Sequence, residues 1–298
     1  MSSPDTSPLS TLWKKIAAAL EFVKFSHTVF ALPFALIAML VAARGLPSWR
    51  VLGLILLCMV SARTAAMAFN RLADWDWDQL NPRTAHRSRL VTPATAKAMV
   101  LVSLALFALG SWLLNPLCTA LCPIAILLVL GYSVTKRFTA YCHLFLGLAL
   151  GAAPIGAWAA VTGTLAAPAP WLLMLGVLAW VFGFDLIYAT LDAEFDKKAG
   201  LHSFPARHGI PASLRLATVL HGAAWVFFLL FGLAAHLGWP WLAAMGGVAV
   251  ALVLEQKWSK EGSVNGDVGK INAAFFQINA VVSLLLLSSA LLSLWNRF

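Results

Sequence analysis

Long apolar stretches recur along almost the whole of this 298-residue chain. An α-helix needs about 20 mostly apolar residues to cross the roughly 30 Å hydrocarbon core of a bilayer. A spanning β-barrel would instead show short segments of alternating polarity, so helices are the expected spanning elements. Nine stretches approach the required length: residues 16–42, 50–73, 94–114, 116–134, 143–163, 168–190, 214–236, 239–256 and 272–295.

The composition supports the same class of protein. Hydrophobic residues make up 61% of the chain and charged residues only 11%, whereas soluble domains carry about 25% charged residues. The net charge of +9 follows the expected topology: with the N-terminus inside, 17 of the 21 Lys and Arg residues fall on one side and three on the other. The positive-inside rule then places the N-terminus and the charged loops in the cytoplasm, and no nucleic-acid partner is expected.

We expect one transmembrane domain over residues 1–298, because no polar stretch is long enough to form a separate soluble domain. Residues 1–15 are polar and lack the apolar core and small-residue cleavage site of a signal peptide. Two longer polar loops, residues 74–93 and 192–213, follow helices that run in the same direction through the membrane. Both loops are therefore predicted on the cytoplasmic side, where they would carry the active site.

Two matched acidic clusters stand at the starts of these loops. In the first, Asn70, Asp74 and Asp78 recur every four residues. Steps of four keep side chains on one helix face, so the cluster would project as a single stripe. One such pair of aspartates is common in a solvated loop, but two with the same spacing and sidedness favour a functional site. The second cluster consists of Tyr188, Asp192 and Asp196.

The chemistry of the two clusters indicates a magnesium and diphosphate site. Closely spaced carboxylates repel one another unless a cation lies between them, and hard oxygen ligands suit Mg²⁺, which commonly binds through one or two carboxylates and a substrate's phosphates. Basic side chains on the same membrane face would bind the diphosphate itself. The candidates are Lys24, Arg83, Arg87, Lys136, Arg137, Lys197 and Arg207.

Two ionisable residues are predicted deeper in the membrane. Arg63 lies seven residues before Asn70, and Asp185 seven before Asp192. That spacing places each of them on its stripe and roughly 10 Å further from the loop. Such residues usually mark a site, a water cavity or an ion path. Arg63 either pairs with an acid of the bundle or binds an anionic group of a substrate, which Asp185 would assist by accepting a hydrogen bond or proton.

A diphosphate headgroup at the membrane face, with the rest of the molecule in lipid, indicates a polyprenyl diphosphate substrate. Neutralising the diphosphate would let the allylic C–O bond ionise. The resulting carbocation would need electron-rich neighbours, and aromatic faces attract cations. Tyr132 and Tyr188 are the candidates, and an acceptor that carries an anion would be held by Arg63.

These residues resemble the motifs of the UbiA superfamily of intramembrane prenyltransferases. The first cluster matches NxxxDxxxD and is followed by NPRT, and residues 185–196 match DxxYAxxDxxxD. The segments GYSVTKRFT and GLHSFPARHG resemble further conserved parts of the family, and the likeness runs from about residue 20 to residue 280.

The resemblance implies a nine-helix bundle around a central cavity that opens sideways to lipid, two Mg²⁺ ions and transfer of a prenyl chain. It implies that Arg63 meets an acceptor carboxylate, that Asp185 assists the acceptor, and that Lys136 and Tyr132 contact the diphosphate and the cation. The metal set it implies is Asp74, Asp78, Asp192 and Asp196, with Asn70 assisting.

The stretches FVKFSHTVFALPFAL, GAAPIGAWAAVTG and INAAFFQIN resemble bacterial 4-hydroxybenzoate polyprenyltransferases of ubiquinone synthesis. They also resemble relatives that prenylate a hydroxynaphthoate in the futalosine route to menaquinone. Both acceptors carry a carboxylate, so Arg63 does not distinguish them. The expected location is a bacterial inner membrane, with the site facing the cytoplasm.

Two alternatives fit the sequence less well. A secondary transporter would show helices interrupted by Gly or Pro at mid-membrane in two corresponding segments, whereas the charges here gather at helix ends. A haem-modifying or chlorophyll-modifying relative within the family would give Arg63 no obvious role.

Overall fold

Apart from the side chains of Arg87 and Ser88, the computed structural model describes residues 17–23 and 30–295. In this part of the chain the secondary structure is helical, without a strand. Eight helical segments are long and apolar enough to cross a membrane. They are α3 (Trp49–Ala73), α5 (Pro93–Leu114), α6 (Pro116–Thr135), α7 (Cys142–Thr162), α8 (Ala169–Ala189) with its continuation to Lys198, α11 (Ile210–Ala234), α12 (Gly238–Asn265) and the segment Val268–Leu294.

These eight segments coincide with eight of the nine predicted stretches. The remaining stretch, residues 16–42, contains a helical turn at 17–22 and the apolar helix α2 (Leu32–Ala43). Residues 24–29 lie outside the described part of the chain, so a ninth continuous span and the side on which the N-terminus lies stay predictions.

Several helices begin where the local sequence satisfies the free N–H groups of a first turn. The side chains of Ser48, Thr92 and Asn115 accept hydrogen bonds from the backbone N–H three residues later, at the starts of α3, α5 and α6. Proline occupies the first turn of α5 and α6, where its missing N–H costs nothing. The polar breaks between apolar stretches therefore act as helix starts.

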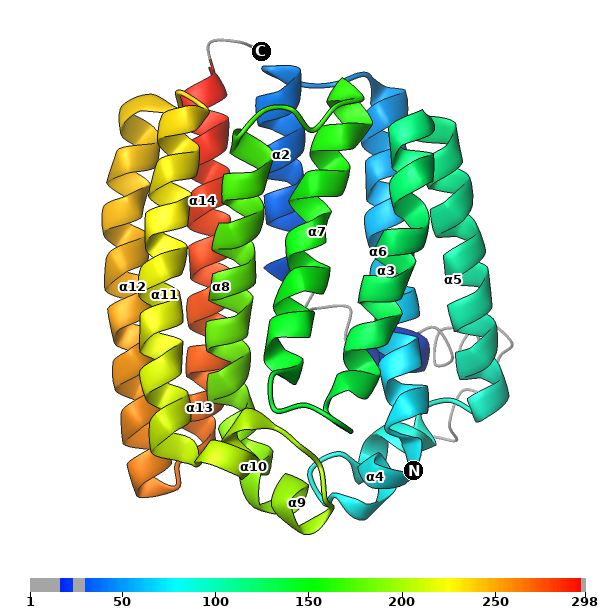
Figure 1. Ribbon diagram of the computed structural model, residues 1–298, viewed down its shortest axis with the longest axis vertical. Coiled ribbons are helices and arrows are strands. Elements are labelled where there is room, and N and C mark those ends of the chain that lie inside the picture. Colours follow the sequence, from blue (N-terminus) through cyan, green and yellow to red (C-terminus); the bar gives the residue numbers. More distant parts are fainter. Residues whose placement is uncertain (1–16, 24–29, 296–298) are drawn as a thin grey trace, which may run out of the picture.

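The long helices form two adjoining groups (Figure 1). Helices α2, α7, α8, α11, α12 and α14 (Asn279–Leu294) make a closed ring, in which each contacts the next. Helices α3, α5 and α6 contact one another, and α3 and α6 also contact α7. Beyond one end of the bundle lie the short helices α4 (Trp75–Leu80), α9 (Ala193–Lys198) and α10 (Phe204–His208).

The polarity of the surface is that of a membrane protein. Large apolar side chains in the middle of the outer helices are exposed: Leu101 is 68% exposed, Leu127 73% and Val253 68%. Inside, small residues bring helices together, since a Cβ added to Gly147 of α7 would lie 2.7 Å from the carbonyl oxygen of Leu178 in α8. Close packing through small residues is typical of helices in lipid. The chain is therefore a multi-pass membrane protein.

Candidate active site

Both acidic clusters stand where a long helix breaks. Helix α3 ends at Ala73, Asp74 departs from helical geometry (φ −98°, ψ 10°), and α4 starts at Trp75. Helix α8 ends at Ala189 and continues through a single 3-10 turn, Thr190–Asp192, into α9. In the first cluster the backbone hydrogen bonds still follow the four-residue spacing. The N–H of Asp74 donates to the carbonyl oxygen of Asn70 (3.0 Å), and the N–H of Asp78 donates to the carbonyl oxygen of Asp74 (2.7 Å).

The two clusters share one cavity of about 590 Å³. Its wall is formed by the ends of α3, α6 and α8, the start of α7, the loop after α4 and residues 268–276. We call it the polar cavity. Among the predicted site residues, those that line it are Arg63, Asn70, Asp74, Asp78, Arg83, Tyr132, Lys136, Asp185, Tyr188, Asp192 and Asp196.

In this structure one aspartate of each cluster is paired with a cation of the protein. The Lys136 ammonium lies 2.8 Å from Asp74, and the Arg83 guanidinium binds Asp192, with Nε donating to Oδ1 at 2.9 Å. Burial alone would lower the pKa of Lys136, but its attraction to Asp74 outweighs burial, so the pKa is raised. Burial likewise opposes the charge of Arg83, whose pKa the hydrogen bond with Asp192 raises. Both cations therefore stay charged.

The donor set of the polar cavity fits Mg²⁺. The four aspartates of the two clusters and the Asn70 amide line it, and the buried Oδ1 of Asp74 has no hydrogen-bond partner in the described structure. As they are now arranged, no three His, Cys, Asp or Glu side chains of the described residues converge on one point. An open set of hard oxygen ligands, completed by phosphate oxygens, is the way Mg²⁺ is often held. The chemistry therefore matches a metal that binds together with its substrate.

Arg63 lies at the deep end of the polar cavity. Its buried Nε has no hydrogen-bond partner, and within the described residues Arg63 forms no ion pair with an acid. In the described part of the chain, Arg63 therefore does not stabilise the helix bundle by pairing with an acid. An unpaired guanidinium beside a cavity is suited to bind an anion.

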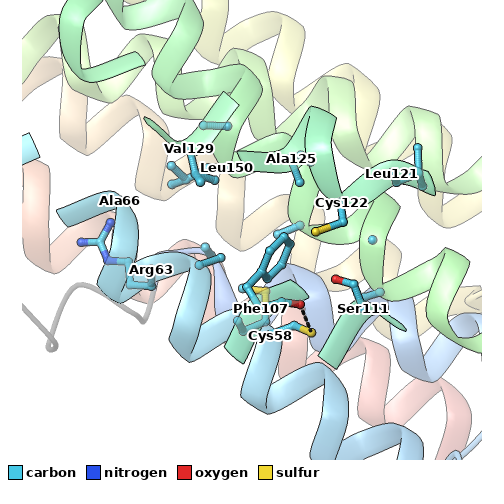
Figure 2. A pocket seen from close by; sticks show the side chains of 18 of the residues that line it. Cys58, Arg63, Ala66, Phe107, Ser111, Leu121, Cys122, Ala125, Val129 and Leu150 are labelled. Atoms are coloured by element: carbon cyan, nitrogen blue, oxygen red, sulfur yellow. Dashed lines mark hydrogen bonds between the residues drawn. The ribbon is translucent and has the colours of Figure 1, made fainter. Parts of the chain in front are cut away.

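A second, apolar pocket of about 150 Å³ continues from this point between α3, α5, α6 and α7. Figure 2 shows Arg63 at one end, with Ser111 and Leu121 toward the other. The two hollows share the side chains of Arg63, Tyr132, Leu146 and Leu150. The polar headgroup site therefore opens into a space bounded by apolar and small side chains.

Asp185 has a partner that the sequence did not predict. Nδ1 of the buried His143, at the start of α7, lies 2.6 Å from Oδ2 of Asp185, and His143 lines the polar cavity. The two residues are 42 positions apart, so no local spacing connects them. The only sequence signal was an imidazole near the polar end of an otherwise apolar helix.

Other lining residues were also missed. Arg71 lies 3.6 Å from Asp78, and Asn81 donates to Asp192 at 3.2 Å, so both join the acidic clusters. Phe275 and Phe276 add two aromatic rings to the lining, from a helical segment near the end of the chain. Nothing in the local sequence marks these residues as part of a site. Only their contacts in the folded chain show that they line the polar cavity.

Some predicted diphosphate ligands are not brought to the polar cavity. Arg137 donates instead to the carbonyl of Ala73 at 2.6 Å, and its guanidinium lies over the Trp77 ring, 4.9 Å from the centroid. Lys197 and Arg207 are exposed and lie outside the cavity lining. Lys24 and the side chain of Arg87 lie outside the described residues.

Comparison with curated proteins gives close agreement over most of the chain. A 4-hydroxybenzoate octaprenyltransferase of Alkalilimnicola ehrlichii is 36% identical over 222 residues, which are 73% of this chain and 74% of that protein. A 4-hydroxybenzoate solanesyltransferase of Synechocystis is 32% identical and covers 67% of this chain and 68% of its own length.

Solved structures share the fold. The apo structure of a UbiA homolog from Aeropyrum pernix is 30% identical, with a TM-score of 0.80, covering 90% of this chain and 98% of that one. A UbiA homolog from Archaeoglobus fulgidus bound to GPP and Mg²⁺ has a TM-score of 0.69 at 18% identity, covering 93% of this chain and 99% of that one.

The UbiA prenyltransferase family matches residues 31–278. This range holds both acidic clusters, Arg63, Lys136 and the His143–Asp185 pair. The protein is thus a membrane-embedded member of the UbiA prenyltransferase family.

Proposed function

We propose that this protein transfers a polyprenyl group from a polyprenyl diphosphate to the ring of 4-hydroxybenzoate, as a step of ubiquinone synthesis. The observation that carries the proposal is the junction of the polar cavity with the apolar pocket at Arg63 and Tyr132. A molecule with an anionic headgroup and a long apolar tail fits such a pair of spaces. The names of the relatives support 4-hydroxybenzoate as the acceptor.

Lys136 and Arg83 are the cations proposed to bind the diphosphate. Both hold carboxylates in this structure, so each has to exchange Asp74 or Asp192 for a phosphate oxygen when the substrate enters. Guanidinium and ammonium groups bind phosphate oxygens through charge-assisted hydrogen bonds. Mg²⁺, held by the aspartates of both clusters with help from Asn70, would supply further neutralisation of the leaving diphosphate. We propose two such ions, one for each cluster.

Tyr132 and Tyr188 are proposed to face the allylic carbon as it gains positive charge. Both line the polar cavity, and Tyr132 also lines the apolar pocket, where the prenyl chain would lie. An aromatic face stabilises a cation most where water is excluded. In the transfer, the allylic C–O bond breaks, its electron pair leaves with the diphosphate, and a ring carbon of the acceptor bonds to the allylic carbon.

Arg63 and Asp185 are proposed to hold the two ends of the acceptor. The unpaired Arg63 would bind the carboxylate, and Asp185, held by His143 at 2.6 Å, would accept a hydrogen bond from the hydroxyl group. Asp185 would also take the proton that the ring loses after the new C–C bond forms. A carboxylate within reach of the departing proton is the usual requirement for such a base.

The charged loops are proposed to face the cytoplasm of a bacterial inner membrane. The support is the unequal distribution of Lys and Arg, 17 against three. In this orientation the polar cavity would open toward the side where a charged diphosphate and a soluble aromatic acid are both available.

The test is turnover by the purified protein in detergent with Mg²⁺ and a polyprenyl diphosphate. Separate reactions receive 4-hydroxybenzoate, a hydroxynaphthoate or no acceptor, and products are identified by mass spectrometry. We expect prenylated 4-hydroxybenzoate. Preference for the naphthoate would place the same chemistry in menaquinone synthesis, and no prenylated product with either acceptor would overturn the proposal.

A further inference from the structure

The last membrane segment of the chain is not a regular helix. It runs as α13 (Val268–Ala273), a π-helical turn η4 (Ala274–Ile278) and α14 (Asn279–Leu294). A π-turn widens the helix and displaces its backbone hydrogen bonds, and such turns are frequent at functional sites. Phe275 and Phe276, which both line the polar cavity, lie within this turn.

A buried polar pair holds the turn from behind. The Asn279 amide donates to Oε1 of Glu255 in α12 at 2.7 Å, and to the backbone carbonyls of Phe275 at 2.9 Å and Ala274 at 3.4 Å. Glu255 and Asn279 are both 0% exposed. The two hydrogens of a single amide group therefore join the carbonyls of the π-turn to a carboxylate on the neighbouring helix. In lipid-buried helices polar groups need such partners within the protein.

The front of the turn carries an aromatic wall, which consists of Phe30, Phe184, Tyr188, Phe275 and Phe276. The Phe275 ring stacks on Tyr188 with centroids 4.2 Å apart and planes at 27°. It also meets Phe30 and Phe184 edge-on, each at 5.4 Å. All five rings line the polar cavity.

Tyr188 connects the aromatic wall to the headgroup site. Nη1 of Arg83 donates to the Tyr188 hydroxyl at 2.8 Å, and the guanidinium lies 5.2 Å from the ring centroid. Arg83 in turn binds Asp192. A continuous series of contacts thus runs from Glu255, through Asn279, the π-turn and Tyr188, to the second acidic cluster.

We propose that Glu255 and Asn279 are positioning residues, which hold the π-turn so that Phe275 keeps Tyr188 packed over the reacting carbon and water out. The inference rests on the proposed function for its chemical consequence. An allylic cation bonds either to a ring carbon of the acceptor, with loss of the ring proton to a base, or to a water oxygen. Capture by water also loses a proton and yields a prenyl alcohol.

The ratio of prenyl alcohol to prenylated acceptor therefore measures how well the aromatic wall keeps water away from the allylic cation. Glu255→Leu and Asn279→Leu each remove the hydrogen bond that joins α12 to the turn, and we expect the ratio to rise about tenfold. Glu255→Gln keeps a side-chain oxygen that can accept from Asn279, so it should retain the wild-type ratio. Phe275→Leu, which leaves the polar pair intact, should raise the ratio as well.

The adjacent residue provides a matched control. Gln256 bonds Thr218 at 2.8 Å and His221 at 3.0 Å, and Nδ1 of the same His221 lies 3.6 Å from Oε2 of Glu255. Gln256→Leu removes hydrogen bonds from the same helix and from His221, but it leaves the bonds of Asn279 to Glu255 and to the π-turn carbonyls intact, so its product ratio should match the wild type. An equal rise in Gln256→Leu would show that general loosening of the bundle is responsible and would overturn the proposal.

Hydrogen–deuterium exchange provides a readout that does not need turnover. Amides of residues 274–279 should exchange about tenfold faster in Glu255→Leu and Asn279→Leu than in the wild type or Gln256→Leu, since the turn opens locally more often. Unchanged exchange together with an unchanged product ratio would overturn the positioning role. Faster exchange in a protein whose wild type forms no prenylated product would instead count against the proposed function alone.

Discussion

Arg83 binds Asp192 across a sequence separation of 109 residues and so joins the loop that follows the first acidic cluster to the second cluster. Its Nε donates to Oδ1 of Asp192 at 2.9 Å, and its Nη1 reaches the hydroxyl of Tyr188 at 2.8 Å. The clusters therefore do not lie apart as two solvated loops. They line one cavity, and the positive charge of Arg83 is opposite to that of the expected diphosphate substrate.

Arg83→Met should weaken use of the diphosphate substrate. It removes a charge-assisted, two-point contact, so kcat/KM for the prenyl diphosphate should fall about 100-fold. The measurement is steady-state turnover at fixed acceptor concentration. Arg137→Met is the matched control, because Arg137 lies on the same face but outside the polar cavity; an equal loss in both variants would contradict a specific role for Arg83.

Asp74→Ala and Asp192→Ala should each lower kcat by about 1,000-fold, since they remove oxygen ligands proposed to hold Mg²⁺. Asp76→Ala and Glu194→Ala are controls, because these exposed acids stand in the same two segments but do not line the cavity. Chelation of divalent ions should abolish turnover of the wild type, and added Mg²⁺ should restore it. Undiminished turnover in chelator would contradict the metal proposal.

Arg63→Met should weaken binding of the acceptor and leave binding of the prenyl donor unchanged. The KM for 4-hydroxybenzoate should rise about 30-fold, while its methyl ester, which lacks the charge, should be used equally by variant and wild type. Initial rates with both acceptors measure this. Arg50→Met is a control, since Arg50 donates to the carbonyl of Leu113 at 2.6 Å and lines neither cavity. An unchanged KM for the acid in Arg63→Met would remove Arg63 from the acceptor site.

Gly156→Leu should discriminate against long prenyl donors. Gly156 lines the apolar pocket, and a Cβ added there meets no atom within 4 Å, so the new side chain fills space meant for substrate. We expect kcat/KM for a donor of eight isoprene units to fall about tenfold more than for dimethylallyl diphosphate. Gly131→Leu also has free space but lies outside the pocket lining, so it should leave that ratio unchanged. A uniform loss for all donors would argue against the pocket as the chain site.

His143→Phe should lower kcat about 100-fold with little change in the KM for the diphosphate, because it leaves Asp185 without its partner. His143→Gln, which can still donate to the carboxylate, should recover part of the rate. A variant whose only defect is a higher donor KM would show that His143 serves the headgroup and not the acceptor.

Much of the fold follows from the periodicity of polarity along the chain. Eight spanning segments lie within a few residues of their predicted ends, apart from two extensions. The α8 segment continues eight residues past the predicted end at 190, to Lys198, and α12 runs nine residues past 256, to Asn265. The α12 extension is polar and charged, so hydropathy alone misses it. The acidic spacing placed Asn70, Asp74 and Asp78 together, although the helix breaks at Asp74.

The assignment of cations was less successful. Proximity in sequence suggested seven diphosphate ligands. The structure describes the side chains of five of them, and of these five only Arg83 and Lys136 line the polar cavity. Arg137, Lys197 and Arg207 do not line it. A long side chain can reach several nearby partners. Arg137 donates a hydrogen bond to the Ala73 carbonyl and packs over the Trp77 ring. Which of these partners it binds depends on the tertiary structure and cannot be predicted from the local spacing of residues.

The sequence by itself determined a membrane bundle, two acidic clusters on one side and an arginine at depth, because polarity and helical spacing are local properties of a chain in lipid. Only the tertiary structure decided which cation meets which carboxylate, that His143 holds Asp185, and that Glu255 and Asn279 brace a π-turn behind Phe275. Those contacts join residues from different helices. Their geometry is set by how the helices pack, and packing is a property of the whole chain.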